Sequence, residues 1–158
     1  MAARRQVAVA AIFALAAMGA IASSNEAPNE PRDELPFSYG TMQSSCAPWD
    51  GPAIAITLTR EPAQCKRIAG PFLSLAIWRG LPIHAGQVVK FVPGTDVGWA
   101  ARCVKEGDCT PAQSGTIVFD HYQQDSGAAG HYELQFKSSE TMKGSFEVKW
   151  CAERVFCG

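Results

Sequence analysis

The dipeptide His-Tyr occurs at residues 121–122 and again at residues 131–132, and few other stretches of this chain carry chemically active side chains. Asp120 precedes the first pair and Glu133 follows the second. Imidazole nitrogens and carboxylate oxygens are zinc ligands, and they are also the groups that transfer protons in acid–base catalysis. The stretch is therefore the first candidate for a metal or catalytic site.

Strand parity argues against such a site if the stretch forms a β-hairpin, because successive side chains of a strand point to opposite faces. Pairing Phe119 with Leu134 gathers the large apolar side chains on one face. In that register His121 lies opposite Tyr132 on the inner face, whereas His131 lies on the outer face. Metal ligands must converge at about 2 Å from one point. The sequence therefore predicts no metal site and no cofactor here.

A β-bulge is the alternative, because Gly127 or Gly130 could host one and so shift the parity. The remaining histidine, His84, lies in a turn without a partner that the sequence identifies. There is no G-x-S-x-G elbow and no glycine-rich phosphate loop. The sequence thus predicts no catalytic residue. A secreted hydrolase with His84 or His121 beside a carboxylate is the alternative.

The strand after the hairpin continues the same pattern. Pairing Leu134 with Val148 keeps the apolar side chains on the inner face. The outer face then carries Asp120, Glu133 and Lys149 in one row, where Glu133 and Lys149 form a cross-strand ion pair.

Four tryptophans are the next candidates, because indole rings can stack on sugars or anchor a protein partner. Trp150 faces inward by the parity of its strand. Trp49 and Trp99 lie in or near loops rich in Pro and Gly, and Trp78 has the opposite parity to the apolar residues of its strand. We therefore take Trp49, Trp78 and Trp99 as candidate binding residues, and weigh against this the interpretation that they only cap the core.

All six cysteines lie after the N-terminal apolar run, and an even number in an exported chain predicts three disulfides. Cys103 and Cys109 bracket a short turn and should bridge each other. The pairs Cys46–Cys151 and Cys65–Cys157 are then expected, with Cys46–Cys65 and Cys151–Cys157 as the alternative. The Cys103–Cys109 loop, with Lys105 as an anchor, could act like a protease inhibitor.

Short apolar or alternating segments, separated by Pro and Gly, predict an all-β fold. We expect a single disulfide-stapled antiparallel β-sandwich of seven or eight strands, Ig-like or jelly-roll-like, with a small β-barrel as the alternative. The predicted strands are residues 53–60, 72–79, 87–92, 97–104, 116–123, 131–137 and 145–151.

The N-terminal residues have the pattern of a secretory signal: two arginines, an apolar run too short to span a bilayer, and a small-x-small site ending at Ala22. We therefore expect a signal peptide at 1–22, a flexible acidic, Pro-rich tether at 23–40 and one domain at 41–158. The remaining chain has 12 basic and 15 acidic residues, a net charge of −3. This argues against binding nucleic acid or an anionic membrane surface, and no membrane span is expected after cleavage.

The C-terminal sequence contains the pattern G-x-Y-x-L-x-F at residues 130–136, followed by G-x-F-x-x-x-W-C at residues 144–151. It resembles the ends of small exported bacterial β-proteins of uncharacterised activity. The resemblance implies an exported β-protein and assigns no functional residue. We therefore expect a secreted or periplasmic, non-catalytic binding or envelope-structural protein with a protein or glycan partner.

Overall fold

A computed structural model of the chain describes residues 36–65, 68, 70–92, 94–153 and 155–158. The expected signal peptide and the tether as far as residue 35 lie outside the described residues. The sequence predicts that the tether runs to residue 40, whereas Phe37 is already buried and the first strand begins at Tyr39. The folded domain therefore begins earlier than its composition suggests.

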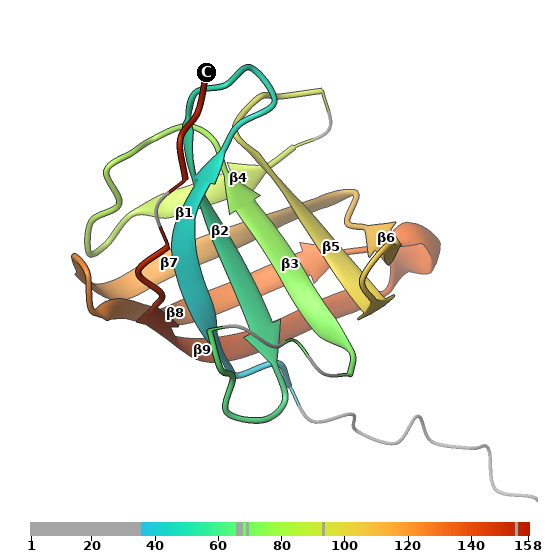
Figure 1. Cartoon of the computed structure of the whole chain (residues 1–158). Coiled ribbons are helices and arrows are strands. Elements are labelled where there is room, and N and C mark those ends of the chain that lie inside the picture. Colours follow the sequence, from blue (N-terminus) through green and yellow to red (C-terminus); the bar gives the residue numbers. More distant parts are fainter. Residues whose placement is uncertain (1–35, 66–67, 69, 93, 154) are drawn as a thin grey trace, which may run out of the picture. The chain divides into compact units, whose positions relative to one another are not determined.

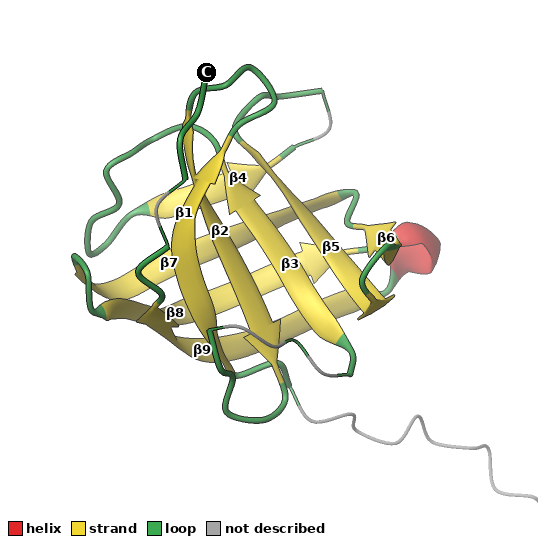
Figure 2. Ribbon diagram, viewed as in Figure 1, coloured by secondary structure: helices red, strands yellow, loops and turns green. Residues whose placement is uncertain are grey.

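The described residues form an all-β structure with one short 3₁₀ helix, η1 (Figure 2). Seven strands overlap the predicted segments, and two, β1 and β6, were not predicted. β1 escapes the pattern because Met42 is its one large buried apolar side chain. The elements are β1 Tyr39–Cys46, β2 Pro52–Thr59, β3 Phe72–Ile77, β4 Val88–Phe91, β5 Gly98–Lys105, β6 Asp108–Pro111, β7 Ser114–Gln123, β8 Gly127–Gln135, η1 Lys137–Ser139 and β9 Thr141–Trp150.

The nine strands belong to one open sheet in the order β4-β7-β8-β9-β1-β2-β3-β5-β6. Strands β4, β7, β8 and β9 lie behind β1, β2, β3 and β5 and cross them, so that the sheet folds back over itself (Figure 1). The strand pairs are antiparallel except β1 with β9, which run parallel. The expectation of a purely antiparallel arrangement is therefore wrong at this one junction.

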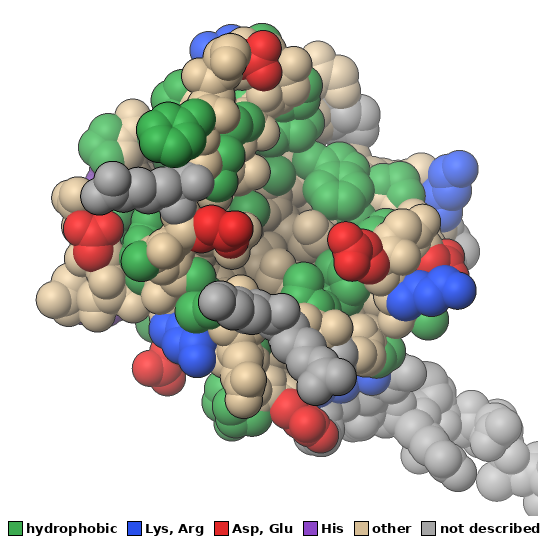
Figure 3. All heavy atoms as spheres, in the orientation of Figure 1, with side chains coloured by type: hydrophobic (Ala, Val, Ile, Leu, Met, Phe, Trp, Pro, Cys, Tyr) green, Lys and Arg blue, Asp and Glu red, His purple; other side chains and the backbone are tan. Residues whose placement is uncertain are grey.

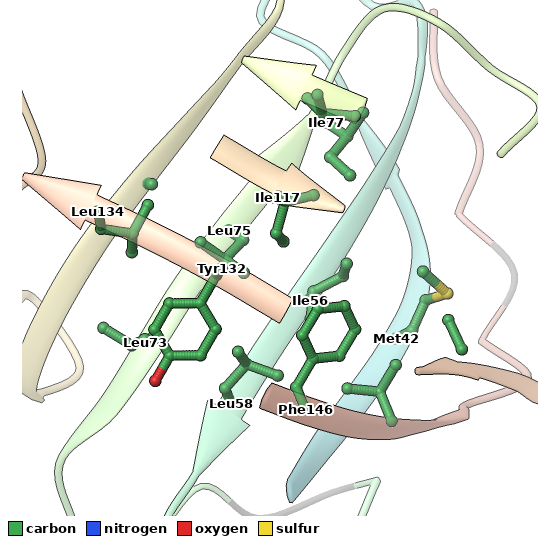
Figure 4. Packing of buried hydrophobic residues seen from close by; sticks show 14 of the residues in the cluster. Met42, Ile56, Leu58, Leu73, Leu75, Ile77, Ile117, Tyr132, Leu134 and Phe146 are labelled. Atoms are coloured by element: carbon green, nitrogen blue, oxygen red, sulfur yellow. The ribbon is translucent and has the colours of Figure 1, made fainter. Parts of the chain in front are cut away.

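The core lies between the two halves of the folded sheet, and the predicted inner faces supply it. Side chains from both halves point toward one another in Figure 4. The labelled side chains, which are all buried, are Met42, Ile56, Leu58, Leu73, Leu75, Ile77, Ile117, Tyr132, Leu134 and Phe146. No helix among the described residues is long and apolar enough to cross a membrane.

The hairpin of β7 and β8 has the predicted inner face but a different register. Phe119 lies opposite Gly130 rather than Leu134, and Ile117 lies opposite Tyr132. The predicted turn extended to Gly130, whereas the chain already turns at residues 124–126, and Asp125 there has φ 62°. The observed register is shifted from the predicted one by an even number of residues. Because side chains alternate between faces with a period of two, the same side chains stay on the inner face.

Gly130 gives the physical reason for this register. It lies between Phe119 on β7 and Phe146 on β9, whose rings meet edge to face at 5.9 Å. A Cβ at this position would overlap the Val118 carbonyl oxygen and touch Phe146. The two rings can therefore meet over the glycine. The small residues 127–130, which look like a loop in the sequence, belong to a central strand of the sheet.

The register of β8 and β9 also differs from the prediction. Leu134 lies opposite Met142 rather than Val148, and Tyr132 lies opposite Gly144. Glu133 consequently pairs with Lys143 at 3.0 Å and not with Lys149, so the predicted outer row is wrong. As in the first hairpin, a large side chain has a glycine opposite it.

Three disulfides are present, and Cys103–Cys109 is one of them, as predicted. The two long pairs differ: Cys46 bonds to Cys157 and Cys65 to Cys151. The predicted Cys46–Cys151 and Cys65–Cys157 pairs are therefore wrong, as is the alternative with local bridges. Three disulfides indicate an oxidising location, extracellular or periplasmic.

The parallel pairing of β9 with β1 explains the exchanged partners. Trp150 lies level with Met42, and the Cys151 N–H donates to the Met42 carbonyl. Cys151 is therefore still several residues short of the end of β1. The chain continues alongside β1 toward the β1–β2 turn (Figure 1), where Cys157 meets Cys46.

Candidate functional site

A β-bulge brings both histidines of the opening motif to the outer face of the sheet. It lies in β7 between Phe119 and His121 and not at Gly127 or Gly130. His121 is exposed and lies opposite Ala129, so its predicted place at the rim of the core is wrong. The described residues nevertheless contain no group of three His, Cys, Asp or Glu side chains arranged to hold a metal ion.

Asp120 contacts His131 instead, with 3.1 Å between Oδ2 and Nδ1. Ser145 is the cross-strand neighbour of His131, so the outer face carries the three residue types of a hydrolytic triad. The side chains of His131 and Asp120 are 54% and 60% exposed. Transition-state stabilisation depends on preorganised donors in a site that excludes water. This exposed surface therefore favours a plain side-chain contact between His131 and Asp120 over catalysis.

A shallow hollow of about 490 Å³ lies on the same outer face, where β8 carries small residues. We call it the face hollow; its floor includes Gly127 and Ala129, and its walls include His121, Glu147 and Lys149. The strands that form its floor are paired on both sides. A ligand here would therefore meet polar side chains but few free backbone groups.

His84 takes part neither in the Asp120–His131 contact nor in the face hollow. Its ring Nδ1 lies 3.1 Å from the Ala85 carbonyl, and its backbone N–H donates to the Gln87 side chain. The ring is exposed in the β3–β4 loop. These contacts shape the turn and place no carboxylate beside the imidazole.

The candidate tryptophans gather at one end of the described domain. Trp49, from the β1–β2 turn, meets Trp78, just after β3, edge to face at 5.9 Å. The Arg79 guanidinium lies 4.4 Å from the centroid of the Trp49 ring. Trp78 donates its backbone N–H to Val97, which places it beside the start of β5 and Trp99.

Trp78 and Trp99 line a second hollow, of about 770 Å³, at the open edge of the sheet. We call it the edge hollow; Phe91 and Val92 form its wall on the β4 side, and Ala112, from the link between β6 and β7, also lines it. The side chain of Trp99 is 37% exposed and that of Val92 52%. These apolar surfaces therefore face solvent where the two ends of the sheet approach.

Gly98 sets the depth of the edge hollow. A Cβ at this position would lie 2.9 Å from the Phe91 ring and would overlap the Ala76 carbonyl oxygen. The glycine thus lets Phe91 pack directly over β5 and leaves Trp99 next to it at the rim. The sequence shows the inward parity of Phe91, but not that β4 and β5 would become neighbours.

A polar pair borders the tryptophan cluster. Arg79 donates from Nε and Nη2 to the same carboxylate oxygen of Asp96, at 2.9 and 2.5 Å. The hydrogen bond from Arg79 lowers the pKa of Asp96, and the guanidinium charge acts in the same direction. Both side chains are more than half exposed, so the pair orients Arg79 over Trp49 rather than stabilising the fold.

The Cys103–Cys109 segment is a tight hairpin. Cys103 lies directly opposite Cys109, and Lys105 pairs with Asp108 after a register shift. Only Glu106 and Gly107 form the turn, and Gly107 has the positive φ of 80° that such a turn needs. Lys105 is exposed but belongs to a paired strand, so the hairpin offers no long loop to a protease.

A third hollow lies over the face of β1, β2 and β3, and Figure 3 shows it with acidic side chains on either side. Thr41 and Thr57 contribute to it, and Glu106 and Glu153 are the acidic residues that line it. Its lining also includes Cys65, Ile68 and Gly70, from a segment that the structure describes only in part, so we build no site on it.

Comparisons of the chain with protein-family models, with curated proteins and with solved structures find no match.

Proposed function

We propose that this chain is an exported, non-catalytic binding protein that holds its partner at the edge hollow. The observation that carries the proposal is that Trp78 and Trp99 line the edge hollow, and that Trp49, from a third segment, packs against Trp78. Half-exposed indole rings beside an apolar hollow are typical of binding surfaces, where they contribute large contact areas at low entropic cost.

The disulfides support a location outside the cytoplasm, in the periplasm or the extracellular space. A signal peptide at 1–22 and a tether that begins at residue 23 are part of the same proposal. The envelope-structural role belongs to it too, since a tethered binding domain can hold two envelope components together. The hydrolase and protease-inhibitor alternatives receive no support from the exposed His131 or the tight hairpin at Lys105.

We also infer a sandwich-like fold class. The support is the way one half of the sheet lies behind the other with the core between them (Figure 1). The two unpaired edges, at β4 and β6, distinguish this arrangement from a closed barrel.

The test is chemical crosslinking of the full oxidised chain in its own envelope fraction, together with tryptophan quenching by soluble glycans. Capture or quenching should be lost in Trp99→Ala. It should persist in Val104→Ala, which removes an exposed apolar side chain of the same strand outside the hollow. Equal capture and quenching by wild type and Trp99→Ala would show that the edge hollow is not the binding surface.

A further inference from the structure

Strand β4 ends the sheet, and half of its backbone groups face away from its neighbour β7. The Phe119 N–H donates to the Gln87 carbonyl, which fixes the hydrogen-bonding side of the ladder. Backbone groups alternate along an antiparallel pair, so Val89 and Phe91 also bond toward β7. The N–H and C=O groups of Val88 and Lys90 therefore point outward from the sheet, and no described part of the chain bonds to them.

The side chains around this free edge have a defined chemical pattern. Val88, Lys90 and Val92 alternate on the outer face, and the two valines are 51% and 52% exposed. No described carboxylate pairs with Lys90. Phe91 points the other way and lines the edge hollow with Trp99, and Val92, which follows the last residue of the strand, lies at the rim of the same hollow. The edge thus presents apolar, cationic and apolar side chains outside, and an aromatic wall inside.

We propose that an extended segment of a partner protein adds to β4 as a further strand of the sheet. Its backbone hydrogen-bonds to Val88 and Lys90, as in other cases of strand addition. An acidic residue of the segment lies opposite Lys90, and apolar residues lie opposite Val88 and Val92. An alternate side chain of the segment enters the edge hollow against Phe91 and Trp99. This inference rests on the proposed binding function and names the kind of partner.

The charge of Lys90 favours a segment of another protein, rather than a second copy of this chain, as the added strand. In the symmetric antiparallel pairing that joins Val88 of one copy to Val92 of the other, Lys90 faces the same lysine of the second copy. Like charges directly opposite each other destabilise a strand pair, and an edge lysine is a common protection against self-pairing. An acidic residue in the incoming strand turns the same lysine into an attraction.

The test uses two capped, fluorescein-labelled peptides, Thr-Val-Thr-Glu-Phe-Val-Thr and the same sequence with Lys in place of Glu. Fluorescence polarisation measures their binding to the full oxidised chain. Wild type should bind the Glu peptide about fivefold more tightly than the Lys peptide, and Lys90→Glu should reverse the preference by a similar factor. Hydrogen exchange should slow at residues 88–92 when the Glu peptide binds.

The control variant, Trp99→Ala, should weaken both peptides by the same factor and keep the preference, because it changes the hollow and not the charge. Lack of binding by either peptide, or an unchanged preference in Lys90→Glu, would overturn strand addition. Such a result together with Trp99-dependent crosslinking or glycan quenching would leave the proposed binding function standing, so the two failures are distinguishable.

Discussion

The inner face of β7, β8 and β9 and the open edge between β4 and β5 accommodate their large side chains in opposite ways. In the first region Phe119 and Phe146 meet over Gly130, and Tyr132 lies over Gly144. At the open edge the Trp99 side chain lies opposite only the small Ala76, and Trp99 and Val92 both remain exposed to solvent. Changes in the first region should therefore alter stability, and changes at the edge should alter binding.

The largest effect of a single substitution is expected from Gly130→Ala. The added Cβ overlaps the Val118 carbonyl oxygen and presses on Phe146, so that either the strand or the ring must move. We expect a loss of about 3 kcal/mol in the free energy of unfolding, measured by guanidinium titration. The adjacent outward residue gives the control, because Ala129→Val should change stability by less than about 0.5 kcal/mol. Equal stability of the two variants would contradict the packing account of the hairpin register.

The same hairpin shows what sequence patterns could and could not predict. Alternation of Ile117, Phe119, Tyr132 and Leu134 identified the inner face correctly, because facing depends only on parity. The register depends on which residues lie opposite one another, and there Gly130 resembles part of a turn. Its role becomes visible only when Phe119 and Phe146 are known to flank it.

The candidate site also depends on which residues become neighbours, here between segments far apart in the sequence. Sequence position singled out Trp49, Trp78 and Trp99, but no spacing indicates that the β1–β2 turn, the end of β3 and the start of β5 meet, or that β4 approaches β5. The prediction of the two long disulfides failed for a related reason. Cys103 and Cys109 are close in sequence, whereas the partner of Cys46 follows from the parallel pairing of β9 with β1, which needs β1 to be recognised as a strand.

Loss of the Cys103–Cys109 bridge should lower the free energy of unfolding by the next largest amount. The bridge joins β5 to β6 at the edge of the sheet, so its removal tests how far that edge supports the fold. The bridge closes a loop of only six residues' separation, so loop-closure entropy gives about 2 kcal/mol for Cys103→Ser with Cys109→Ser. Chemical denaturation measures this. Removal of Cys46–Cys157, which spans 111 residues, should cost about 5 kcal/mol. A short-bridge loss as large as the long-bridge loss would mean that the hairpin supports the whole sheet.

A smaller change of opposite sign is expected from Tyr132→Phe. The Tyr132 hydroxyl is buried and has no hydrogen-bond partner among the described residues. An unpaired buried hydroxyl is destabilising, so its removal should raise the free energy of unfolding by about 1 kcal/mol. Thermal and chemical denaturation at neutral pH measure the gain. A loss of stability would show instead that the hydroxyl has a bound partner, such as water.

The pH dependence of unfolding gives a second readout at Tyr132. Burial raises the pKa of this phenol above its usual value of 10.0, and the Phe37 backbone acts in the opposite direction without the geometry of a hydrogen bond. A raised pKa in the folded state means that the folded protein holds the proton more tightly. The resulting stability is complete below pH 10 and is lost as the pH rises above it. Wild type should therefore lose stability more steeply than Tyr132→Phe in this range.

The smallest effect on stability, and the sharpest contrast with Gly130, is expected from Arg79→Ala at the open edge. Arg79 and Asp96 are exposed, and exposed ion pairs contribute little to folding. The folded-state pKa of Asp96 is lowered, so what the pair contributes is present at neutral pH and declines only as the pH falls below about 4. The free energy of unfolding at pH 7 should consequently be unchanged within error. The fluorescence of Trp49 should change, since its ring loses the guanidinium that lies over it. Asp96→Asn is the matched variant: it keeps Arg79 but frees it to move, and should shift the same emission by less. A marked loss of stability in either variant would mean that the tryptophan end supports the core, and the division between a packed region and a binding edge would fail.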